Sequence, residues 1–499
     1  MKAIMVQATT SGAGKSTLVA AICSTLRHDG YSVAPFKTQN MSLNSYVAAI
    51  GGTNNEGGEM AVAQAIQAIA AGEEPSVDMN PILLKPKGNL TSSLIINGKW
   101  VGDYSVNSYY GEVVKKGLQI ASDAIKRIGE RDFLVIEGAG SPAEINLYDK
   151  DIANMRTAEL AKAPVIIVGD IERGGVFASL YGTYFLLPEK WRAYVKGFII
   201  NKMGGDPSLL GNGPMKLTSL TGVPVLGVVP YETDLDTPWE DSLDIRTWGK
   251  GPISVAVIRY PGASILTDIE PLRYEADITL NFVEKADQLD NPDVIILPGS
   301  KAARSDLKWM KQVGLDSRIK ALAKEGITVV GICGGAQIMG KKLEDPLGYE
   351  GEEPGADEGM GLLPHTTVFS GKKTVKRTRV EDPFGGRVVG FEIHKGLINW
   401  APDWETGRPL FKADDGIAEG FYDGKIFATL IHHSIFYDGA LRKKILGEVR
   451  KLKGIPDPQE KNPADELMNS IQKAEDLLRR SVNIKEIIRI AEEGIPRRS

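Results

Sequence analysis

The chain opens with the stretch A3-I-M-V-Q-A-T-T-S-G-A-G-K-S-T17, which decides the fold of its first half. Its first apolar residues are typical of a short buried strand, and the small residues that follow predict a tight turn into a helix. Gly14, Lys15 and Ser16 have the order found in a P-loop, where backbone amides and a lysine hold phosphates and the hydroxyl binds Mg²⁺. Thr9 stands where that motif usually begins with glycine. The stretch predicts a strand–turn–helix unit that binds a nucleotide.

Similar apolar runs alternate with helical patterns along most of the chain. The further strands are expected at 133–137, 165–169, 197–201, 225–229, 253–258, 294–297 and 327–332. Continuous apolar strands separated by helices indicate parallel sheets that are covered on both faces. The fold class expected is therefore α/β, with two doubly wound domains and a C-terminal helical tail.

The domain limits follow from breaks in this pattern. A tract rich in Asp, Pro and Trp at 234–244 and a glycine-rich stretch at 248–252 predict a linker over about 236–250. The first domain is then 1–235, the second 251–445 and the tail 446–499. In the tail, Asn462 is expected to cap a helix with Pro463 in its first turn. The apolar residues expected on one face of that helix are Leu467, Ile471, Ala474 and Leu478.

Composition and charge restrict the class of protein. The 499 residues carry a formal charge of −5, which argues against a nucleic-acid binder that relies on bulk electrostatics. No run approaches 18 consecutive apolar residues, so no membrane span is expected. Two cysteines, Cys23 and Cys333, make no disulfide framework and suit a reducing compartment. These features predict a cytoplasmic enzyme; they do not specify its oligomeric state.

Several charged and amide residues at strand ends extend the expected nucleotide site. Glu137 closes a strand, where a carboxylate of the Walker-B kind holds Mg²⁺. Lys37 follows a second short strand, and Asn201 ends another in a place suited to reading a purine ring. Arg173 lies beside a glycine pair and suits an anionic group. Each of Lys37, Arg173 and Asn201 is by itself equally consistent with a solvated loop residue.

A second chemical site is expected in G331-I-C-G-G-A-Q-I-M-G340, which follows an apolar run. A sharp strand-to-helix turn exposes its central side chain and directs helix amides at it, which favours a thiolate nucleophile. A buried structural cysteine is the commoner alternative. Glycine on both sides of Cys333 is expected to have no packing role, and this favours the nucleophile.

A thiol nucleophile needs a base, and the chain has five histidines. The segment I426-F-A-T-L-I-H-H-S434 is expected to be a strand that ends at His432 or His433, and one of these is the expected partner of Cys333. The turn from Pro298 to Lys301 follows another strand, and its amides could form an oxyanion hole.

These residues resemble two known families. The Cys333 turn with a late histidine resembles a class I glutamine amidotransferase domain, and the N-terminal half resembles the dethiobiotin-synthetase-like ATP-dependent ligases. Their fusion in this order looks like the cobyric acid synthase family, and the resemblance covers nearly the whole chain. The most specific matches are F36-K-T-Q-N-M-S-L-N-S45, E59-M-A-V-A-Q-A-I-Q-A-I-A-A-G72, I82-L-L-K85, I136-E-G-A-G-S-P-A-E-I-N-L147, G169-D-I-E-R-G-G-V-F-A178 and the turn from Pro298 to Lys301.

The resemblance implies an activity and a role for each domain. Residues 1–235 would be a P-loop ATP-dependent amidoligase and 251–445 a glutamine amidotransferase. Adenosylcobyrinic acid a,c-diamide, a corrinoid, would have its b, d, e and g carboxylates converted to amides with ATP, Mg²⁺ and L-glutamine. No nucleic acid or membrane partner is implied.

The same resemblance assigns residues to these steps. Cys333 would form a γ-glutamyl thioester and release ammonia, and a phosphorylated corrinoid carboxylate would capture that ammonia at the other site. The residues carried over for phosphate and metal are Lys15, Ser16 and Glu137. Lys37 matches a second catalytic lysine, and Asn201 matches the residue that reads adenine. Glu59 is carried over as a second metal ligand.

Departures from the family pattern bear on the second site. The histidine region usually reads G-T-Y-x-H-G-x-F, whereas here it is A428-T-L-I-H-H-S-I-F436, so the alignment selects His432 from the left and His433 from the right. The preceding strand favours His432. Ser434 stands where most amidotransferases have a glutamate, so a Cys–His dyad is expected. Other departures are Ala8 for glycine, Thr38 for proline, Ala336 for an aromatic residue and Thr366 for a common glutamate.

Two alternatives stay open at the level of sequence. The sister a,c-diamide synthase performs the same chemistry on two other carboxylates, and the segment Q39-N-M-S-L-N44 argues against it. A non-catalytic P-loop switch protein with an inactive amidotransferase domain is the alternative from another class. The missing glutamate argues against CTP synthase, which has the same order of domains.

Overall fold

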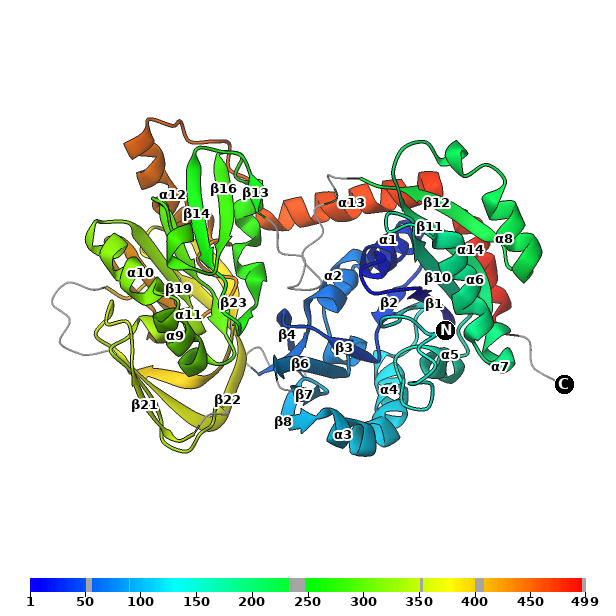
Figure 1. Cartoon of the computed structure of the whole chain (residues 1–499), viewed down its shortest axis with the longest axis horizontal. Helices are drawn as coiled ribbons and strands as arrows, with labels where there is room; N and C mark the ends of the chain where they lie inside the picture. Colours follow the sequence, from blue (N-terminus) through cyan, green and yellow to red (C-terminus); the bar gives the residue numbers. More distant parts are fainter. Residues whose placement is uncertain are drawn as a thin grey trace. The chain divides into compact units, whose positions relative to one another are not determined.

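The computed structural model describes residues 1–50, 56–88, 90–232, 235, 247–350, 353–399 and 408–495. The chain divides into two compact units that are not continuous in sequence (Figure 1). The first contains 1–42, 58–240 and 467–499, and the second contains 43–57 and 241–466. Each unit therefore receives a segment from the other half of the chain. Most of the linker expected at 236–250 lies outside the described residues.

The first unit is built on a six-stranded parallel sheet in the order β12-β11-β10-β1-β9-β2. Its strands are β1 (Lys2–Ala8), β2 (Val33–Phe36), β9 (Phe133–Glu137), β10 (Val165–Asp170), β11 (Val195–Met203) and β12 (Val225–Pro230). Alternate residues of β1 enter two different cores: Ile4 and Val6 pack on one face, and Met5 packs on the other. Both faces are thus covered, which confirms the doubly wound parallel sheet expected from the apolar runs.

Helices cover both faces of this sheet. They are α1 (Lys15–His28), α2 (Val62–Ala71), α4 (Val114–Ile128), α5 (Met155–Ala161), α6 (Val176–Leu186), α7 (Glu189–Arg192) and α8 (Gly213–Thr221). A smaller sheet adds β3 (Gln39–Met41), β6 (Ile82–Gly88), β7 (Thr91–Ile96) and β8 (Lys99–Ser105) in that order. It is followed by α3 (Val106–Ser108) and a π-helical turn, η2 (Tyr109–Val113).

The second unit contains a seven-stranded sheet in the order β13-β16-β14-β17-β19-β27-β26. Its five inner strands are parallel: β14 (Ile253–Ile258), β16 (Ile278–Val283), β17 (Val294–Leu297), β19 (Thr328–Ile332) and β27 (Ile426–Thr429). The edge strands β13 (Trp248–Gly249) and β26 (Phe421–Asp423) are antiparallel. Its helices are α9 (Ala303–Gln312), α10 (Leu315–Lys324), α11 (Gly334–Met339), α12 (Gly439–Lys453) and the 3₁₀ segment η5 (Leu266–Tyr274).

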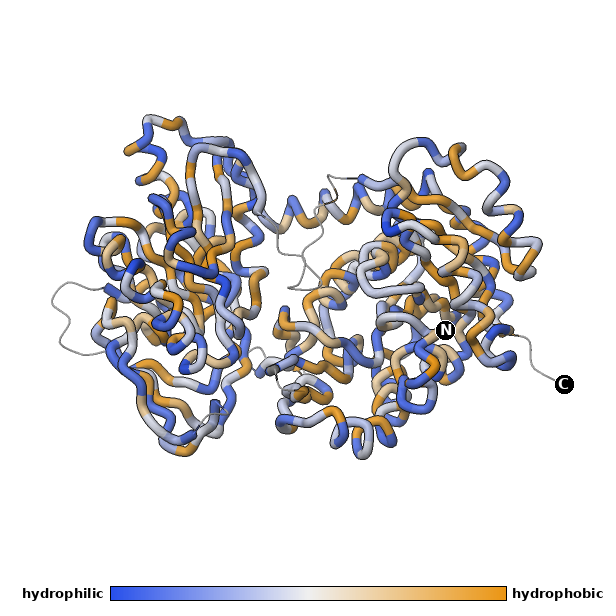
Figure 2. The backbone as a smooth tube through the Cα atoms, viewed as in Figure 1, coloured by the Kyte–Doolittle hydropathy of each residue, from blue (hydrophilic) through white to orange (hydrophobic). Residues whose placement is uncertain are grey.

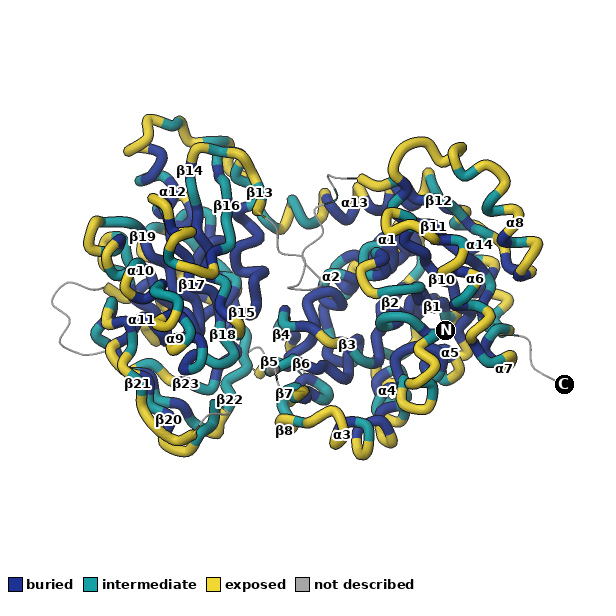
Figure 3. Tube along the Cα trace, in the orientation of Figure 1, coloured by how far each residue is buried: buried dark blue, intermediate teal, exposed yellow. Residues whose placement is uncertain are grey.

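A second sheet of this unit contains two long antiparallel strands, β22 (Thr366–Glu381) and β23 (Arg387–Asn399). Its other strands are β20 (Lys342–Asp345), β21 (Gly355–Glu358), β24 (Phe411–Ala413) and β25 (Ala418–Glu419). Shorter strands are β4 (Ser45–Ala49), β5 (Gly57–Ala61), β15 (Ala263–Ser264) and β18 (Gly299–Ser300). Figures 2 and 3 show hydrophobic and buried residues concentrated in the interior of each unit. Within the described residues, the structure contains no helix with the length and hydropathy of a membrane span.

The tail forms the two amphipathic helices that its pattern predicts, α13 (Pro463–Ser481) and α14 (Ile484–Glu493). The side chain of Asn462 accepts a hydrogen bond from the backbone N–H of Ala464, as expected of a cap. Ile471 and Leu478 enter the same buried core as Leu18 of the first long helix. From Leu467 onward the tail therefore belongs to the first unit and covers one face of its sheet, whereas residues 446–466 belong to the second unit.

This packing predicts the effect of truncating one tail residue. Leu478 is 1% exposed, so Leu478→Ala leaves a cavity and should lower the free energy of unfolding by about 2–4 kcal/mol. Met468 lies on the same helix at 40% exposure, and Met468→Ala serves as the control with little expected effect. Urea unfolding compares the two variants. Equal transition midpoints would show that α13 does not belong to this core.

Candidate active sites

The phosphate-binding turn of the first unit depends on a backbone conformation that favours glycine. Gly14 precedes the first helix with φ 87°. A side chain there would also meet Nδ2 of Asn201 at 2.4 Å. Lys15 Nζ donates to the backbone carbonyls of Thr10 and Gly140, each at 3.3 Å. The ammonium is thereby held across the turn where the phosphates of a nucleotide would lie.

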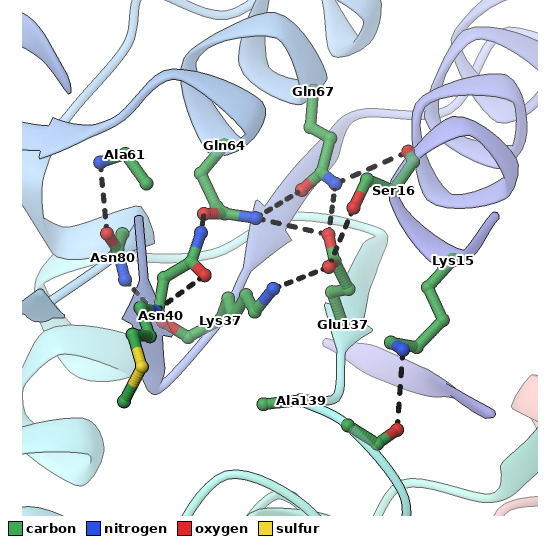
Figure 4. A network of polar contacts seen from close by, with 12 residues as sticks. Lys15, Ser16, Lys37, Asn40, Ala61, Gln64, Gln67, Asn80, Glu137 and Ala139 are labelled. Carbon is green, nitrogen blue, oxygen red and sulfur yellow. Dashed lines mark hydrogen bonds and ion pairs between the residues drawn. The ribbon is translucent and has the colours of Figure 1, made fainter. Parts of the chain in front are cut away.

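A buried carboxylate stands at the centre of this site (Figure 4). Glu137 is fully buried at the end of β9, and its Oε1 accepts from Ser16 Oγ at 2.9 Å and pairs with Lys37 Nζ at 2.6 Å. Its Oε2 accepts from Gln67 at 2.5 Å and from Gln64 at 3.1 Å. Burial alone would raise the pKa of Glu137, but the charge of Lys37 and these hydrogen bonds outweigh it and lower the pKa. The group is therefore a carboxylate at neutral pH.

Gln64 and Gln67 were not singled out by the sequence analysis. They stand three residues apart, so they share one face of α2, and both side chains are buried. The stretch that contains them matches the family, but only Glu59 was selected from it. Glu59 instead pairs with Lys85 in a buried ion pair. Its assignment as a metal ligand stays a prediction.

A second acidic residue, Asp170, lies at the end of β10 and is 4% exposed. Its Oδ2 lies 3.1 Å from Lys202 Nζ and 3.7 Å from Nε of Arg173. Lys202 Nζ also donates to the backbone carbonyl of Gly12 at 2.7 Å. The arginine predicted to bind an anion thus lies near the phosphate-binding turn, and Asp170 and Lys202 were missed because nothing in their spacing marks them.

Two cavities adjoin this turn. One of about 130 Å³ is lined by Asn201, Tyr231 and Leu478, so the tail helix contributes to it. The other, of about 350 Å³, is lined by Met41 and Tyr109 among other residues. The first has the apolar walls and the amide that suit a purine ring, and the second is large enough for part of a bulky molecule.

The cysteine turn of the second unit has the strained geometry expected of a nucleophile. Cys333 follows β19 with φ 51° and ψ −109°, and it is 4% exposed. Its glycine neighbours do have a packing role, contrary to expectation. A side chain on Gly334 would meet the backbone nitrogen of Ser300 at 2.5 Å, and one on Gly335 would meet the carbonyl of Leu297 at 2.0 Å. These glycines bring the cysteine turn against the Pro298–Lys301 turn.

A carboxylate that the expected Cys–His dyad does not include orients the histidine. His432 is 1% exposed, and its Nδ1 lies 2.7 Å from Oδ2 of Asp268 in η5. Burial alone would lower the pKa of His432, but Asp268 and the sulfur of Cys333 raise it to about 10. Asp268 therefore extends the predicted pair of Cys333 and His432, and the Nε2 atom of His432 has no hydrogen-bond partner among the described residues. Asp268 was missed because its carboxylate comes from a segment 164 residues away and not from the usual position after the histidine.

His433 occupies a different environment. Its Nε2 lies 2.9 Å from Oγ1 of Thr267, and its ring stacks on Tyr437 with centroids 4.3 Å apart. Burial lowers its pKa to about 4. The strand expected to reach the histidines ends at Thr429, because the chain turns there. The geometry supports His432 as the partner of Cys333, and this assignment stays a prediction.

Phe391 of β23 fixes the position of His432. The two residues exchange backbone hydrogen bonds of 2.8 and 3.1 Å, and their rings stack with centroids 5.4 Å apart. On another side, a side chain built on Gly299 would meet Cε1 of His432 at 3.0 Å. The Pro298–Lys301 turn is thus close to the imidazole, where an oxyanion hole is expected.

Comparisons with known proteins match the two halves of the chain to two different domain families. Residues 4–243 match the CobQ/CobB/MinD/ParA nucleotide binding domain, and residues 254–440 match the CobB/CobQ-like glutamine amidotransferase domain. A probable cobyric acid synthase of Methanocella arvoryzae is 45% identical, covering 95% of this chain and 96% of the relative. A cobyric acid synthase of Clostridium botulinum is 41% identical, covering 98% and 99%.

Among solved structures, the MinD cell division protein of Aquifex aeolicus is 14% identical over 47% of this chain and 84% of its own, with a TM-score of 0.25. The curated relatives match both halves in the same order and over nearly their full length. The chain belongs to the cobyric acid synthase family, whose members are amidoligases with a nucleotide-binding domain and a glutamine amidotransferase domain.

Proposed function

We propose that this chain converts the b, d, e and g carboxylates of adenosylcobyrinic acid a,c-diamide into amides, with ATP and glutamine consumed at each step. One observation carries the proposal: a strained cysteine, a buried histidine paired with Asp268, and a P-loop with a buried carboxylate lie on one chain that matches cobyric acid synthases over nearly its whole length. ATP, glutamine and two unpaired cysteines suit the cytoplasm.

The second unit would generate ammonia. Sγ of Cys333 attacks the side-chain carbonyl carbon of glutamine, and the proton held by His432 passes to the departing nitrogen. The amides of the neighbouring turn would stabilise the oxyanion. Water then attacks the γ-glutamyl thioester, His432 accepts the proton, and glutamate leaves. Asp268 holds the imidazole by its Nδ1, which leaves Nε2 to serve both proton transfers.

The first unit would use that ammonia. Lys15 and the amides of its helix would hold the phosphates, and the γ-phosphoryl group would pass to a corrinoid carboxylate to give an acyl phosphate and ADP. Ammonia attacks the acyl carbon, phosphate leaves, and a proton is released. Lys37, whose Nζ is paired with Glu137, would supply a second positive charge beside the transferred group.

The residues present fit Mg²⁺. Ser16 Oγ and Glu137 Oε1 are hard oxygen donors 2.9 Å apart at the start of α1. The described residues contain no group of three or more His, Cys, Asp or Glu that could hold a metal alone. Mg²⁺ commonly uses one or two protein oxygens together with substrate phosphates, so this pair suffices. When bound, the ion would neutralise phosphate charge during transfer.

The corrinoid would use the cavity of about 350 Å³. Tyr104, Tyr109 and Tyr110 supply aromatic walls, and Ser11 and Gly140 connect the cavity to the phosphate-binding turn. A cavity of this size holds one edge of a corrin ring, not the whole ring. One site could then accept different carboxylates in turn as the ring is presented by another edge.

Mass spectrometry of adenosylcobyrinic acid a,c-diamide incubated with the protein, MgATP and glutamine tests the proposal. Four successive replacements of a carboxyl OH by NH₂ are expected. An unchanged diamide, together with amidation of cobyrinic acid itself, would instead assign the a,c-diamide synthase reaction.

Cysteine substitution separates the two nitrogen sources. Cys333→Ala should abolish glutamine-dependent amidation and retain amidation from ammonium, because only ammonia generation needs the thiol. Cys23 lies within α1 and is fully buried in the core of the first unit, and Cys23→Ala is the matched control that should retain both. Corrinoid products are measured by mass spectrometry. Loss of ammonium-dependent amidation in Cys333→Ala would contradict the division between the sites.

The buried carboxylate should matter only to the first unit. Glu137→Gln keeps the shape but removes the charge opposite Lys37, so amidation from either nitrogen source should fall by roughly 10²-fold or more. Glutamate release without acceptor should persist. The exposed Glu130→Gln is the control, and amidation rates and glutamate release are assayed in parallel. Full amidation by Glu137→Gln would exclude the metal and phosphate role.

The pairing of His432 with Asp268 makes a pH-dependent prediction. The folded-state pKa of about 10 exceeds the ordinary value of 6.5, so the pair stabilises the fold below pH 6.5 and this stability is lost as pH rises through about 10. Asp268→Asn should bring the pKa of His432 down and reduce the glutaminase kcat by roughly 10²- to 10⁴-fold. NMR titration of the imidazole measures the shift. An unchanged titration would show that Asp268 does not set the charge.

A further inference from the structure

A short segment from the N-terminal half of the chain belongs to the second unit. Residues 43–57 follow β3 of the first unit and precede α2, yet they are grouped with residues 241–466. The described part, 43–50 with residues 56 and 57, contains β4. We call residues 43–50 the inserted segment. Its contacts within the second unit lead to the residues around Cys333.

The first contact is a buried hydrogen bond from Asn44. Its Oδ1 accepts from the backbone N–H of Leu266 at 3.1 Å, and Asn44 is fully buried. The preceding residue, Ile265, has φ 56° and ψ 47°. A β-branched residue adopts this left-handed conformation only where its surroundings enforce it. Asn44 therefore holds a strained turn in place.

That turn begins the segment that carries Asp268. η5 starts at Leu266, and two residues later Asp268 accepts from the backbone N–H of His433 at 2.7 Å and contacts Nδ1 of His432 at 2.7 Å. A shift of the turn would move the carboxylate relative to the imidazole. The hydrogen bond of Asn44 thus fixes the start of η5, and Asp268 in η5 in turn fixes the imidazole of His432.

The second contact is apolar and reaches the other side of the same histidine. Val47 shares a buried cluster with Ile265, Phe391 and Ile393, and the ring of Tyr46 lies 6.1 Å from that of Phe391. Phe391 stacks on His432, and the backbone carbonyl of Ile393 lies 3.6 Å from Sγ of Cys333. The inserted segment therefore contacts the supports of both the histidine and the cysteine.

We infer that Asn44 is a positioning residue for the glutaminase site, so that this site is completed by a segment from the nucleotide-binding half of the chain. The inference rests on the glutaminase role of Cys333 proposed above. Gln39 and Met41, a few residues earlier, line the cavity proposed for the corrinoid. One continuous stretch of sequence thus supplies residues to the acceptor cavity and to the ammonia-generating site.

Two substitutions of Asn44 test this inference. Asn44→Ala removes the acceptor for Leu266, whereas Asn44→Asp keeps an oxygen in its place. We expect Asn44→Ala to lower the kcat for glutamate release by roughly tenfold to 10²-fold with little change in the KM for glutamine. Asn44→Asp should restore most of that loss. Asn469→Ala, exposed on α13, is the control.

Three further readouts separate positioning from folding and from the proposed corrinoid activity. MgATP affinity should be the same in all variants, and NMR should show a lower pKa for His432 in Asn44→Ala alone. Glutamate release needs no corrinoid, so a wild type that fails to amidate the diamide would refute the proposed substrate only. The inference is overturned if Asn44→Ala retains glutaminase activity, if it loses MgATP affinity in parallel, or if Asn44→Asp is as impaired as Asn44→Ala.

Discussion

A parallel strand that ends at a sheet edge and turns at once into a helix is the constraint on which both sites depend. After β1 the turn is made possible by Gly14 at φ 87°, and after β19 it passes through Cys333 at φ 51°. In each case helix amides point at the space beyond the strand. The first turn suits phosphate. The second leaves a thiol at the helix start, and its neighbouring glycines permit a close approach to the adjacent strand end.

Each turn is accompanied by a buried ion pair, and neither pair is independent of its neighbours. Glu137 is neutralised by Lys37 and hydrogen-bonded by Gln64 and Gln67. His432 is paired with Asp268. Buried charges of this kind contribute little net stability, and removal of one partner leaves the other uncompensated. The role we propose for both pairs is therefore chemical: a carboxylate beside the expected phosphate site and an imidazolium beside the cysteine.

Local patterns predicted the parallel strands, both turns and the tail helices, because apolar runs, glycines and caps act within a few residues. The residues that were missed depend on contacts distant in sequence. Asp268 reaches His432 across 164 residues, and the exchange of segments between the two units leaves no periodic signal. The strand expected to end at His432 or His433 stops at Thr429, where the chain turns, and an isolated bridge then pairs His432 with Phe391. The end of this strand is set by pairing with a segment distant in sequence, and a local pattern of apolar residues carries no information about such pairing.

The central claim is that the two sites act in series, with the nitrogen of glutamine reaching the corrinoid. The most direct measurement gives the protein glutamine labelled with ¹⁵N at the side-chain amide, together with MgATP, the a,c-diamide and an excess of unlabelled ammonium. High-resolution mass spectrometry then reads the isotope in each new amide. Our account predicts ¹⁵N in the new amides despite the competing ammonium. Product carrying only unlabelled nitrogen, formed while glutamine is hydrolysed, would contradict it.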